Sequence, residues 1–445
     1  MDGSLDELVL TATDGAKDLT LEDCARMLFP QEGENTPRLR FKGFEGEWNK
    51  AALGKLFTER IESNVNGEML SVTMNNGVIK ASENGRFDNS NSDKSHYKVV
   101  KVNDIAYNSM RMWQGASGCS AYEGIVSPAY TVVTPVEGID SNFFAYLFKT
   151  PSVIRKFRLH SQGLTSDTWN LKYPAFSKIS VSYPKDIEEQ RLIASFLSSL
   201  DKQISAQQQQ LERLKQMKQA CLCLLFPDNQ SITPPLRFKG FKGEWITMKF
   251  TDLFIFLQNN SLSRAELATT GEVKNIHYGD VLIKFGELID MSKDEVPFIK
   301  NKTVAGMLSA NCLLQNGDVV FADAAEDNTV GKSSEIISMG EDRVVSGLHT
   351  IPCRPTRTFS EGFLGYYLNA PSFHDQLLPM IQGTKISSIS KKALMNTCIT
   401  FPDDLEEQRR IASFFRNLDQ QITTQSQQVE KLSQLKKACL NQFIA

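Results

Sequence analysis

The sequence predicts an α+β protein in which two mixed α/β domains are separated by two long helices packed on each other as a coiled coil, in a pseudo-twofold internal repeat. Three observations carry this prediction. A helical stretch at residues 188–226 returns as residues 406–444 with no gap between the copies. Both copies carry a heptad seam of apolar residues. The segments outside the copies differ in sequence but share an outline of short strands and helices.

The two long helices are expected to pack on each other along their seams. Neither interior contains Gly or Pro, and both seams continue over about four heptads. Gln207 and Lys218 interrupt the first seam, and Gln425 and Lys436 interrupt the second at equivalent positions. A polar seam residue weakens a coiled coil but can fix its register and partner. The expected packing residues are Leu197, Leu200, Ile204, Leu211, Leu214, Leu225, Phe415, Leu418, Ile422, Val429, Leu432 and Phe443. The alternative is two independent amphipathic helices, each lying on its own domain.

Composition limits the class of protein. The chain has 445 residues, 41% hydrophobic and 23% charged, which allows two or three ordinary globular domains. A net charge of −3 and a pI near 6.1 argue against a surface that is basic throughout, but not against a local basic cleft. The eight cysteines form no C-x-x-C pair and no zinc spacing with histidine. The N-terminus lacks the basic start of a signal peptide and no apolar run has the length of a membrane span, so a cytoplasmic location is expected.

The order of segments follows from a second repeat. The stretch ending at Trp48 returns in the stretch ending at Trp245, and these tryptophans are expected to anchor packing. The N-terminal region therefore carries a stub equivalent to the last turns of the first long helix. The expected division is an N-terminal tail (1–17), the stub with its following motif (18–48), a first domain (49–184), the central helix and linker (185–235), a second domain (236–402) and the C-terminal helix (403–445).

The two domains share an outline. Each is expected to contain a turn into a strand, a second strand, a helix, a Gln-Gly turn and a closing strand. In the first domain these features fall at 101–107, 124–135, 142–159 and Gln162-Gly163; in the second they fall at 315–321, 347–355, 361–378 and Gln382-Gly383.

No catalytic motif is complete. The stretch TVGKS, 329–333, resembles the end of a phosphate-binding loop, but Glu326 stands where that motif requires its first glycine. The histidines are scattered, and the paired acids Glu188-Glu189 and Glu406-Glu407 open helices, where the helix dipole favours them. We therefore expect a chain that is not an enzyme, with no cofactor and no metal site.

Recognition of DNA is the function that remains. A helix of 38 residues would span about 57 Å at 1.5 Å per residue, and DNA half-sites one turn apart lie about 34 Å from centre to centre. Two domains on such a spacer could read neighbouring stretches of duplex. The candidate DNA-binding residues are Arg86, Lys94, Arg111, Gln162 and Asn170 in the first domain and Lys332, Lys385, Lys391 and Lys392 in the second. The alternative for each is a solvated surface residue.

The motifs 37–48 (PRLRFKGFEGEW) and 234–245 (PPLRFKGFKGEW), together with the E-E-Q-R-x-I-A helix starts at 188 and 406, resemble the specificity subunit of type I restriction–modification enzymes. The resemblance implies two target recognition domains, each binding one half of a bipartite, asymmetric site in double-stranded DNA. It implies that the antiparallel helices set the gap between the halves. Two modification subunits would dock on the chain and supply adenine methylation, and restriction subunits would add translocation and cleavage.

Two other functions stay open on the sequence alone. A coiled-coil adaptor whose domains bind proteins is compatible with the acidic pI. A stand-alone nuclease or methyltransferase has only the incomplete TVGKS stretch in its favour.

Overall fold

The computed structural model describes residues 8–10, 36–37, 39–84, 93–228, 231–383 and 385–440. The chain forms two compact units. Unit 1 extends to Gln209 and takes up the chain again from Ser426, and unit 2 comprises Gln210–Gln425. Each long helix therefore contributes one part to unit 1 and the other to unit 2.

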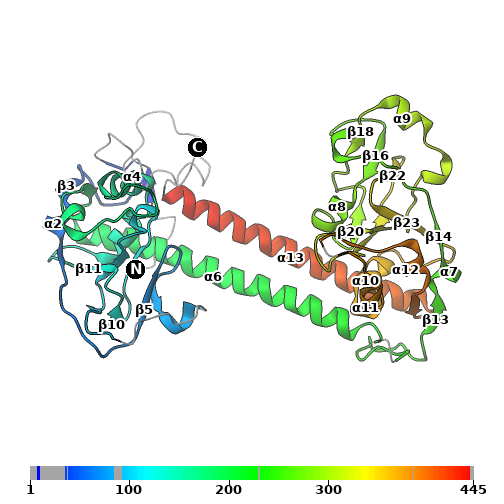
Figure 1. The fold of residues 1–445 in the computed structure, drawn as a ribbon, viewed down its shortest axis with the longest axis horizontal. Coiled ribbons are helices and arrows are strands. Elements are labelled where there is room, and N and C mark those ends of the chain that lie inside the picture. The colour runs from blue at the N-terminus through cyan, green and yellow to red at the C-terminus, as the bar shows by residue number, and fades with distance from the viewer. Residues whose placement is uncertain are drawn as a thin grey trace. The chain divides into compact units, whose positions relative to one another are not determined.

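Unit 1 is built on a four-stranded antiparallel sheet in the order β4-β11-β8-β9; Figure 1 labels β11 of this sheet. Val132 and Val133 of β11 are both buried and belong to different apolar clusters, because successive side chains of a strand point to opposite faces. Three further strand pairs complete the unit: β3-β12, β5-β6 and β7-β10. The strands are β3 Asn49–Ala52, β4 Phe57–Glu59, β5 Leu70–Thr73, β6 Gly77–Lys80, β7 Lys98–Val100, β8 Ile105–Asn108, β9 Ser117–Cys119, β10 Gly124–Val126, β11 Tyr130–Pro135 and β12 Ser180–Tyr183.

A strand lies within the segment expected to be an N-terminal tail (1–17). The strand β1 (Leu8–Leu10) pairs with β2 (Leu39–Phe41). The expected helix stub at 18–29 lies outside the described residues.

Two expectations for the first domain need correction. The single strand expected at 124–135 is two strands, β10 and β11, which pair with different partners. The helix expected around 142–159 is two helices, because Pro151 has no N–H to continue the first and instead begins the second. The helices of unit 1 are α2 Leu53–Leu56, α3 Ser141–Leu147, α4 Pro151–His160 and α5 Tyr173–Phe176, with 3₁₀ turns η2 Ala81–Asn84 and η3 Met112–Gln114.

Unit 2 repeats this plan with an addition. Its main sheet, β14-β23-β19-β21-β17, keeps the four-strand arrangement of unit 1 and adds β17 parallel to β21. A second sheet, β15-β18-β16-β22, contains a parallel pair, β16 and β22, and the pairs β13-β25 and β20-β24 complete the unit. The strands are β13 Ile246–Lys249, β14 Phe254–Phe256, β15 Leu267–Ala268, β16 Val273–Ile276, β17 Leu288–Asp290, β18 Phe298–Ile299, β19 Val319–Ala322, β20 Ala324–Ala325, β21 Ser333–Ile337, β22 Arg343–Ser346, β23 Thr350–Pro355, β24 Ser387–Ser388 and β25 Cys398–Phe401.

The helix expected around 361–378 is also interrupted, at Pro371, for the same reason as in unit 1. The turns expected at the start of 101–107 and 315–321 are present, directly before β8 and β19. Asp104 and Asp318 are buried, and each pairs with an arginine, Arg60 or Arg354. The helices of unit 2 are α7 Phe250–Leu253, α8 Tyr278–Ile283, α9 Lys302–Met307, α10 Phe363–Asn369, α11 Pro371–Leu377 and α12 Lys391–Met395, with 3₁₀ turns η4 Arg264–Glu266, η5 Ala310–Cys312 and η6 Leu378–Met380.

The long helices are α6 (Ile187–Leu224) and α13 (Leu405–Cys439). Each begins after an aspartate whose side chain accepts a bond from the N–H two residues on, Asp186 to Glu188 and Asp404 to Glu406, both at 2.8 Å. No helix in the described part of the chain is long and apolar enough to cross a membrane.

In each unit the repeated R-F-x-G-F motif binds the repeated motif at the start of a long helix. Arg40 donates two 2.7 Å bonds to the buried carboxylate of Glu189. Arg237 does the same to Glu407, at 2.6 and 2.7 Å. These charges are therefore internal pairs, which join each R-F-x-G-F motif to the start of a long helix. Trp48 and Trp245 are buried in the two unit cores, as expected.

The seam residues are buried or half-buried wherever the structure describes them. Leu197 and Leu200 belong to the unit 1 core, and Leu432 packs against that core. Leu225 and Phe415 belong to the unit 2 core. Phe443 lies outside the described residues.

Candidate nucleic-acid interface

A closed loop projects from unit 1 between Gln162 and Asn170. The backbone N–H of each residue donates to the carbonyl of the other, at 3.0 and 2.8 Å. Gly163 has a φ of +147°, and an added Cβ there would lie 2.6 Å from the carbonyl oxygen of Thr168. Side chains 162–168 are exposed. The loop therefore presents polar and apolar side chains to solvent from a fixed base.

The base of this loop is aromatic and cationic. The rings of Trp169 and Trp113 meet edge to face with centroids 5.3 Å apart. The Arg158 guanidinium lies 5.3 Å from the Trp169 ring centroid. The N–H of Leu171 donates to the carbonyl of Ser109 at 2.8 Å, which attaches the loop to the chain leading to Arg111. The structure thus places Arg111, Gln162 and Asn170, three of the predicted residues, around one tryptophan pair.

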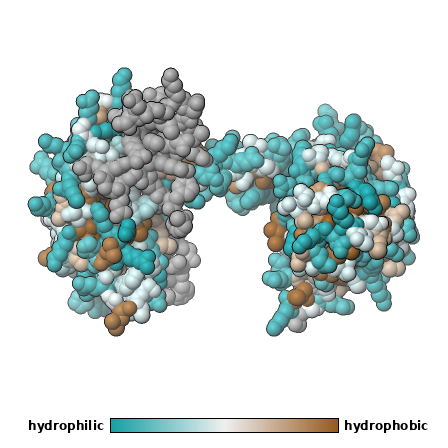
Figure 2. All heavy atoms as spheres, turned by 90° about the horizontal axis from the view of Figure 1, so that it is seen from above, coloured by the Kyte–Doolittle hydropathy of each residue, from teal (hydrophilic) through white to brown (hydrophobic). Residues whose placement is uncertain are grey.

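Helix α4 gives the surrounding surface its charge. Its sequence, PSVIRKFRLH, contains three cations and a histidine but no acid. Lys156 donates to the Ser180 carbonyl at 2.8 Å, whereas Leu159 and, on the loop, Leu164 are exposed apolar side chains. Cations for phosphate and apolar groups for base edges are the combination that DNA readers use. Elsewhere, Figure 2 shows hydrophobic residues only singly or in small groups on a mainly hydrophilic face.

Unit 2 carries an equivalent loop with different chemistry. The N–H groups of Gln382 and Ser388 donate to each other's carbonyls, at 3.0 and 2.7 Å, and the side chains of Lys385 and Ile386 between them are exposed. The strand β24 at the end of this loop pairs with β20. Just before β20, Asp323 contacts Nδ1 of His349 at 3.1 Å, and burial raises the pKa of the Asp323 carboxyl against the opposing effect of that histidine.

The remaining predicted residues do not gather at these loops. The Lys332 ammonium donates to the carbonyls of Leu282 and Phe285 at 3.0 and 2.9 Å, and burial lowers its pKa. We therefore leave Lys332 out of the interface. Lys391 and Lys392 are exposed at the start of α12, with the Lys391 Nζ 5.5 Å from the Phe256 ring centroid. Lys94 is half-buried in a turn, and Arg86 lies outside the described residues.

Sequence reasoning missed several residues of these surfaces. Trp113 is far in sequence from Trp169 and Arg158, and no motif joins them. His349 has a φ of +54°, a conformation that is uncommon outside glycine. The strand expected at 347–355 therefore begins only at Thr350, and His349 lies in the turn before it.

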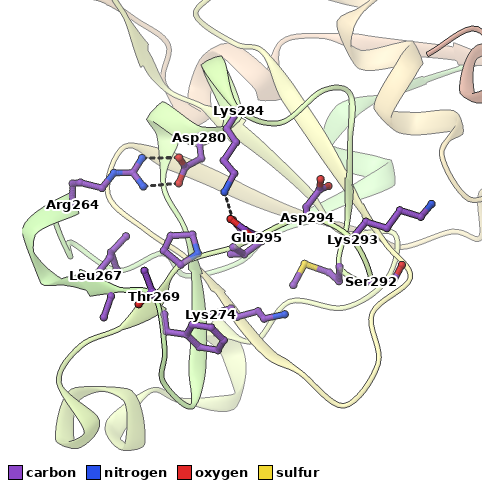
Figure 3. A pocket seen from close by; sticks show the side chains of 15 residues that line it. Arg264, Leu267, Thr269, Lys274, Asp280, Lys284, Ser292, Lys293, Asp294 and Glu295 are labelled. Atoms are coloured by element: carbon purple, nitrogen blue, oxygen red, sulfur yellow. Dashed lines mark hydrogen bonds and ion pairs between the residues drawn. The ribbon is translucent and has the colours of Figure 1, made fainter. Parts of the chain in front are cut away.

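A cavity of about 660 Å³ lies in a part of unit 2 that has no counterpart in unit 1 (Figure 3). Its cations are already engaged. Arg264 makes two bonds to Asp280, at 2.7 and 2.8 Å; Lys274 pairs with Asp342 at 2.7 Å; and Lys284 donates to the Glu295 carbonyl. The cavity therefore offers no unpaired cation among these three for a phosphate. Among the described residues, no group of three or more His, Cys, Asp and Glu could hold a metal ion.

The chain is similar to known proteins in sequence and in fold. A family model, the type I restriction modification DNA specificity domain, matches residues 47–216 and again 243–434. The specificity subunit of the type I restriction enzyme MjaVIII from Methanocaldococcus jannaschii is 22% identical over 370 residues, which cover 77% of this chain and 78% of the relative.

Two solved structures have the same fold. The S subunit of a type I restriction–modification system from M. genitalium has a TM-score of 0.53 at 14% identity, over 88% of this chain and 95% of that one. A chain from a study of complex assembly and conformational transition in a type I R-M system has a TM-score of 0.52 at 17% identity, over 88% and 96%. Because the family model matches twice and covers most of its length, the chain belongs to the type I restriction–modification DNA specificity family.

Proposed function

We infer that this chain is the DNA-recognising, non-catalytic specificity subunit of a type I restriction–modification complex. One observation carries the inference: the family model matches the chain twice. Each match falls on one of the two domains at 49–184 and 236–402, here called heads. The two heads have the same strand order in the main sheet but different projecting loops. The loop 162–170 presents Gln162 and Leu164 above Trp169, with Arg158 of α4 against the Trp169 ring, whereas the loop 382–388 presents Lys385 and Ile386. Different side chains on equivalent scaffolds should read different base sequences.

The architecture proposed for this function is two target recognition domains, 49–184 and 236–402, on an antiparallel coiled coil with pseudo-twofold symmetry. The burial of the seam supports it. Equivalent contacts in the two units support it as well: Arg40 with Glu189 and Arg237 with Glu407. Each domain reads one half of a bipartite, asymmetric site, and the helices set the gap.

The partners follow from membership of the family. They are double-stranded DNA, modification subunits that dock on the chain, two in number, and restriction subunits. The chemistry of methylation and cleavage belongs to those subunits. The cytoplasmic location stays a prediction.

The test is a methylome comparison. DNA from cells that carry this chain with its modification subunit is sequenced for modified adenines, against a deletion of this chain. Adenine methylation at a split, asymmetric motif should disappear with the deletion. Replacing residues 49–184 by the corresponding domain of another family member should then change one half-site only.

Two outcomes would contradict the inference. An unchanged methylation pattern, with no DNA binding by the assembled complex, would favour the protein-binding adaptor. A change in both half-sites on replacing one domain would show that the heads do not read independently.

A further inference from the structure

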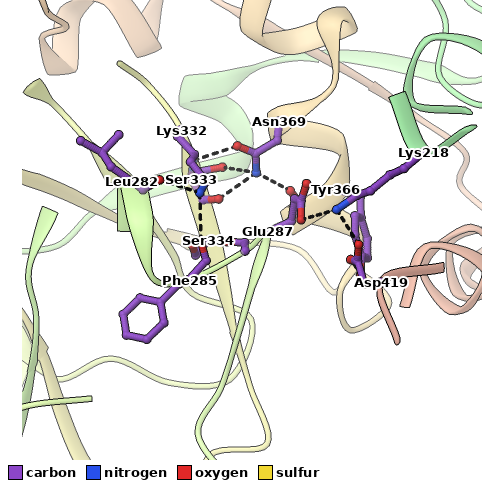
Figure 4. Close-up of polar contacts among 12 residues, drawn as sticks. Lys218, Leu282, Phe285, Glu287, Lys332, Ser333, Ser334, Tyr366, Asn369 and Asp419 are labelled. Carbon is purple, nitrogen blue, oxygen red and sulfur yellow. Dashed lines mark hydrogen bonds and ion pairs between the residues drawn. The ribbon is translucent and has the colours of Figure 1, made fainter. Parts of the chain in front are cut away.

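In both units a lysine, an aspartate and a tyrosine from three different helices meet. In unit 2, Lys218 of α6 pairs with Asp419 of α13 at 2.6 Å, and the Tyr366 hydroxyl of α10 donates to the same carboxylate at 2.8 Å (Figure 4). In unit 1, Lys436 of α13 pairs with Asp201 of α6, and the Tyr146 hydroxyl of α3 donates to Asp201 at 2.8 Å. We call these two sets the lysine–aspartate junctions.

The junctions define one helix register. Moving from Asp201 to Lys218 along α6 covers as many residues as moving back from Lys436 to Asp419 along α13. Apolar neighbours agree, since Phe226 of the chain after α6 stacks on Phe415 of α13 with centroids 5.9 Å apart. The same antiparallel register therefore holds separately in unit 1 and in unit 2.

The lysines occupy two of the polar breaks in the seams, the others being Gln207 and Gln425, and they are only 16% (Lys218) and 24% (Lys436) exposed. A slip of the helices by one heptad would keep apolar residues facing apolar residues. It would separate each lysine from its aspartate and leave the partly buried Asp419 and Lys436 without these partners, which is costly, although Lys218 also pairs with Glu287 of unit 2 at 2.7 Å. The apolar seam alone would therefore allow this slip, whereas the lysine–aspartate junctions oppose it.

We propose that the two lysine–aspartate junctions fix the register of α6 against α13 and thereby the gap between the two half-sites, an inference that rests on the proposed function. A one-heptad slip moves one helix along the other by about 10.5 Å at 1.5 Å per residue, or about three base pairs at 3.4 Å each. The tyrosines connect the register to the heads, because α3 and α10 belong to the two recognition domains. Asp201, Lys218, Asp419 and Lys436 are thus positioning residues for the gap.

Charge reversal tests the proposal. The full chain, with its modification subunits, is assayed for methylation on duplexes that carry its two half-sites at a series of gap lengths. The unaltered complex should prefer one gap by about tenfold or more. Asp201→Lys with Asp419→Lys places lysine against lysine in both junctions, so this preference should fall or move to another gap, with the half-sites unchanged.

Restoring one junction is the matched control. Adding Lys436→Glu to the double variant recreates an opposite-charge pair at the first junction and should restore the original gap preference. A residue that merely stabilised the fold would lower methylation at every gap equally and would not shift the preferred one.

Insertion provides a second test. Seven residues inserted after Gln207, together with seven after Val429, lengthen both helices between the junctions and preserve both pairs. This variant should select a single gap about three base pairs longer. The same insertion in α6 alone cannot satisfy both junctions, so its preference for one gap should be weaker.

The outcomes separate the two inferences. If the unaltered complex methylates no split site, the proposed function is wrong. If it reads a split site but the charge-reversed chain keeps the same gap preference, or the one-sided insertion selects a gap as sharply as the two-sided one, the junctions do not set the register.

Discussion

The two heads stabilise the same helix start with different residues. In unit 1, Asp140 precedes α3 and its carboxylate accepts the Phe143 N–H at 2.8 Å. In unit 2, α10 begins after Gly362, and the buried Glu335 of β21 accepts the N–H groups of Gly362 and Gly365 at 2.7 and 2.8 Å. Cys119 holds the place of Glu335 in unit 1, since the two lie opposite the first residues of β8 and β19.

The contrast shows which parts of the head are free to vary. Gln190 and Gln408 at the starts of the long helices bind equivalent backbone N–H groups, those of Asp140 and Ser360, both at 2.9 Å. The contact between the head and the start of its long helix is therefore the same in both units. Inside the head, any acceptor that reaches the free N–H groups of the helix start is sufficient. Divergent sequences can thus share one scaffold.

The largest expected effect concerns the arginine–glutamate pairs. Glu189→Ala should lower the free energy of unfolding by about 3–5 kcal/mol, because it leaves Arg40 buried without its partner. Glu407→Ala should cost less, since the Arg237 side chain is 18% exposed against 8% for Arg40. Glu189 also accepts the Trp48 indole N–H at 3.3 Å, whereas the Trp245 indole N–H has no partner among the described residues.

Urea unfolding of the full chain measures this difference. Glu188→Ala is the matched control, because Glu188 is exposed and pairs with Arg191 on the surface, so it should change stability by less than about 0.5 kcal/mol. Equal losses for Glu189→Ala and Glu407→Ala would contradict the comparison.

The exposed cations of the two heads should act on separate half-sites. Arg111→Ala in unit 1 and Lys385→Ala in unit 2 each remove an exposed cation, and each should weaken binding to DNA by roughly 1–3 kcal/mol if it contacts a base. Each variant should relax selectivity at its own half-site and leave the other intact. Methylation of duplexes with substitutions in either half measures this, and each variant serves as the control for the other. Relaxation of both halves by one variant would count against separate readers.

The cap of α10 predicts a pH dependence peculiar to unit 2. Burial raises the pKa of Glu335 to about 7 from 4.5, against the opposing effect of the two N–H bonds. Over that interval the folded state keeps a proton that the unfolded state has released. The stability of unit 2 should therefore fall as the pH rises from about 4.5 to about 7.

Glu335→Gln should remove this decline in urea unfolding measured between pH 5 and 8. Glu341→Gln, at an exposed position in the same unit, should leave the decline in place. A decline that persists in Glu335→Gln would assign it to another group.

The smallest expected effect is at Lys149, which lies beside the junction of unit 1. Burial, and then repulsion from Lys436, lower the pKa of Lys149 to about 8 from 10.5. The folded state therefore releases a proton between pH 8 and 10.5 that the unfolded state keeps, so stability should rise over that interval. Lys149→Asn, which introduces the residue found at the equivalent Asn369, should abolish the rise and stabilise the chain at pH 7. Thermal unfolding at pH 7 and 9.5 measures both effects, and a less stable variant at pH 7 would contradict the argument.

Sequence reasoning predicted the repeated long helices, their apolar seams and, in outline, a few of the strands and helical segments of each head. These features are local or periodic, so the spacing of apolar residues reveals them. It failed where one residue changes the chain path: Pro151 and Pro371 divide helices that the apolar pattern runs through. It named Arg111, Gln162 and Asn170 as candidates without grouping them, and their DNA contacts stay a prediction; it gave no hint of Trp113, Trp169 or Arg158.

By itself, the sequence determined that this protein has two versions of one unit, because duplication survives as matching motifs at constant spacing. Only the tertiary structure decided which motifs meet. Arg40 and Glu189 are 149 positions apart, and a single chain contains no pattern that pairs them. Lys218 and Lys436 appeared in the sequence as defects in an apolar seam. Their partners Asp419 and Asp201 lie across the helix pair, so folding was needed to turn each defect into an ion pair.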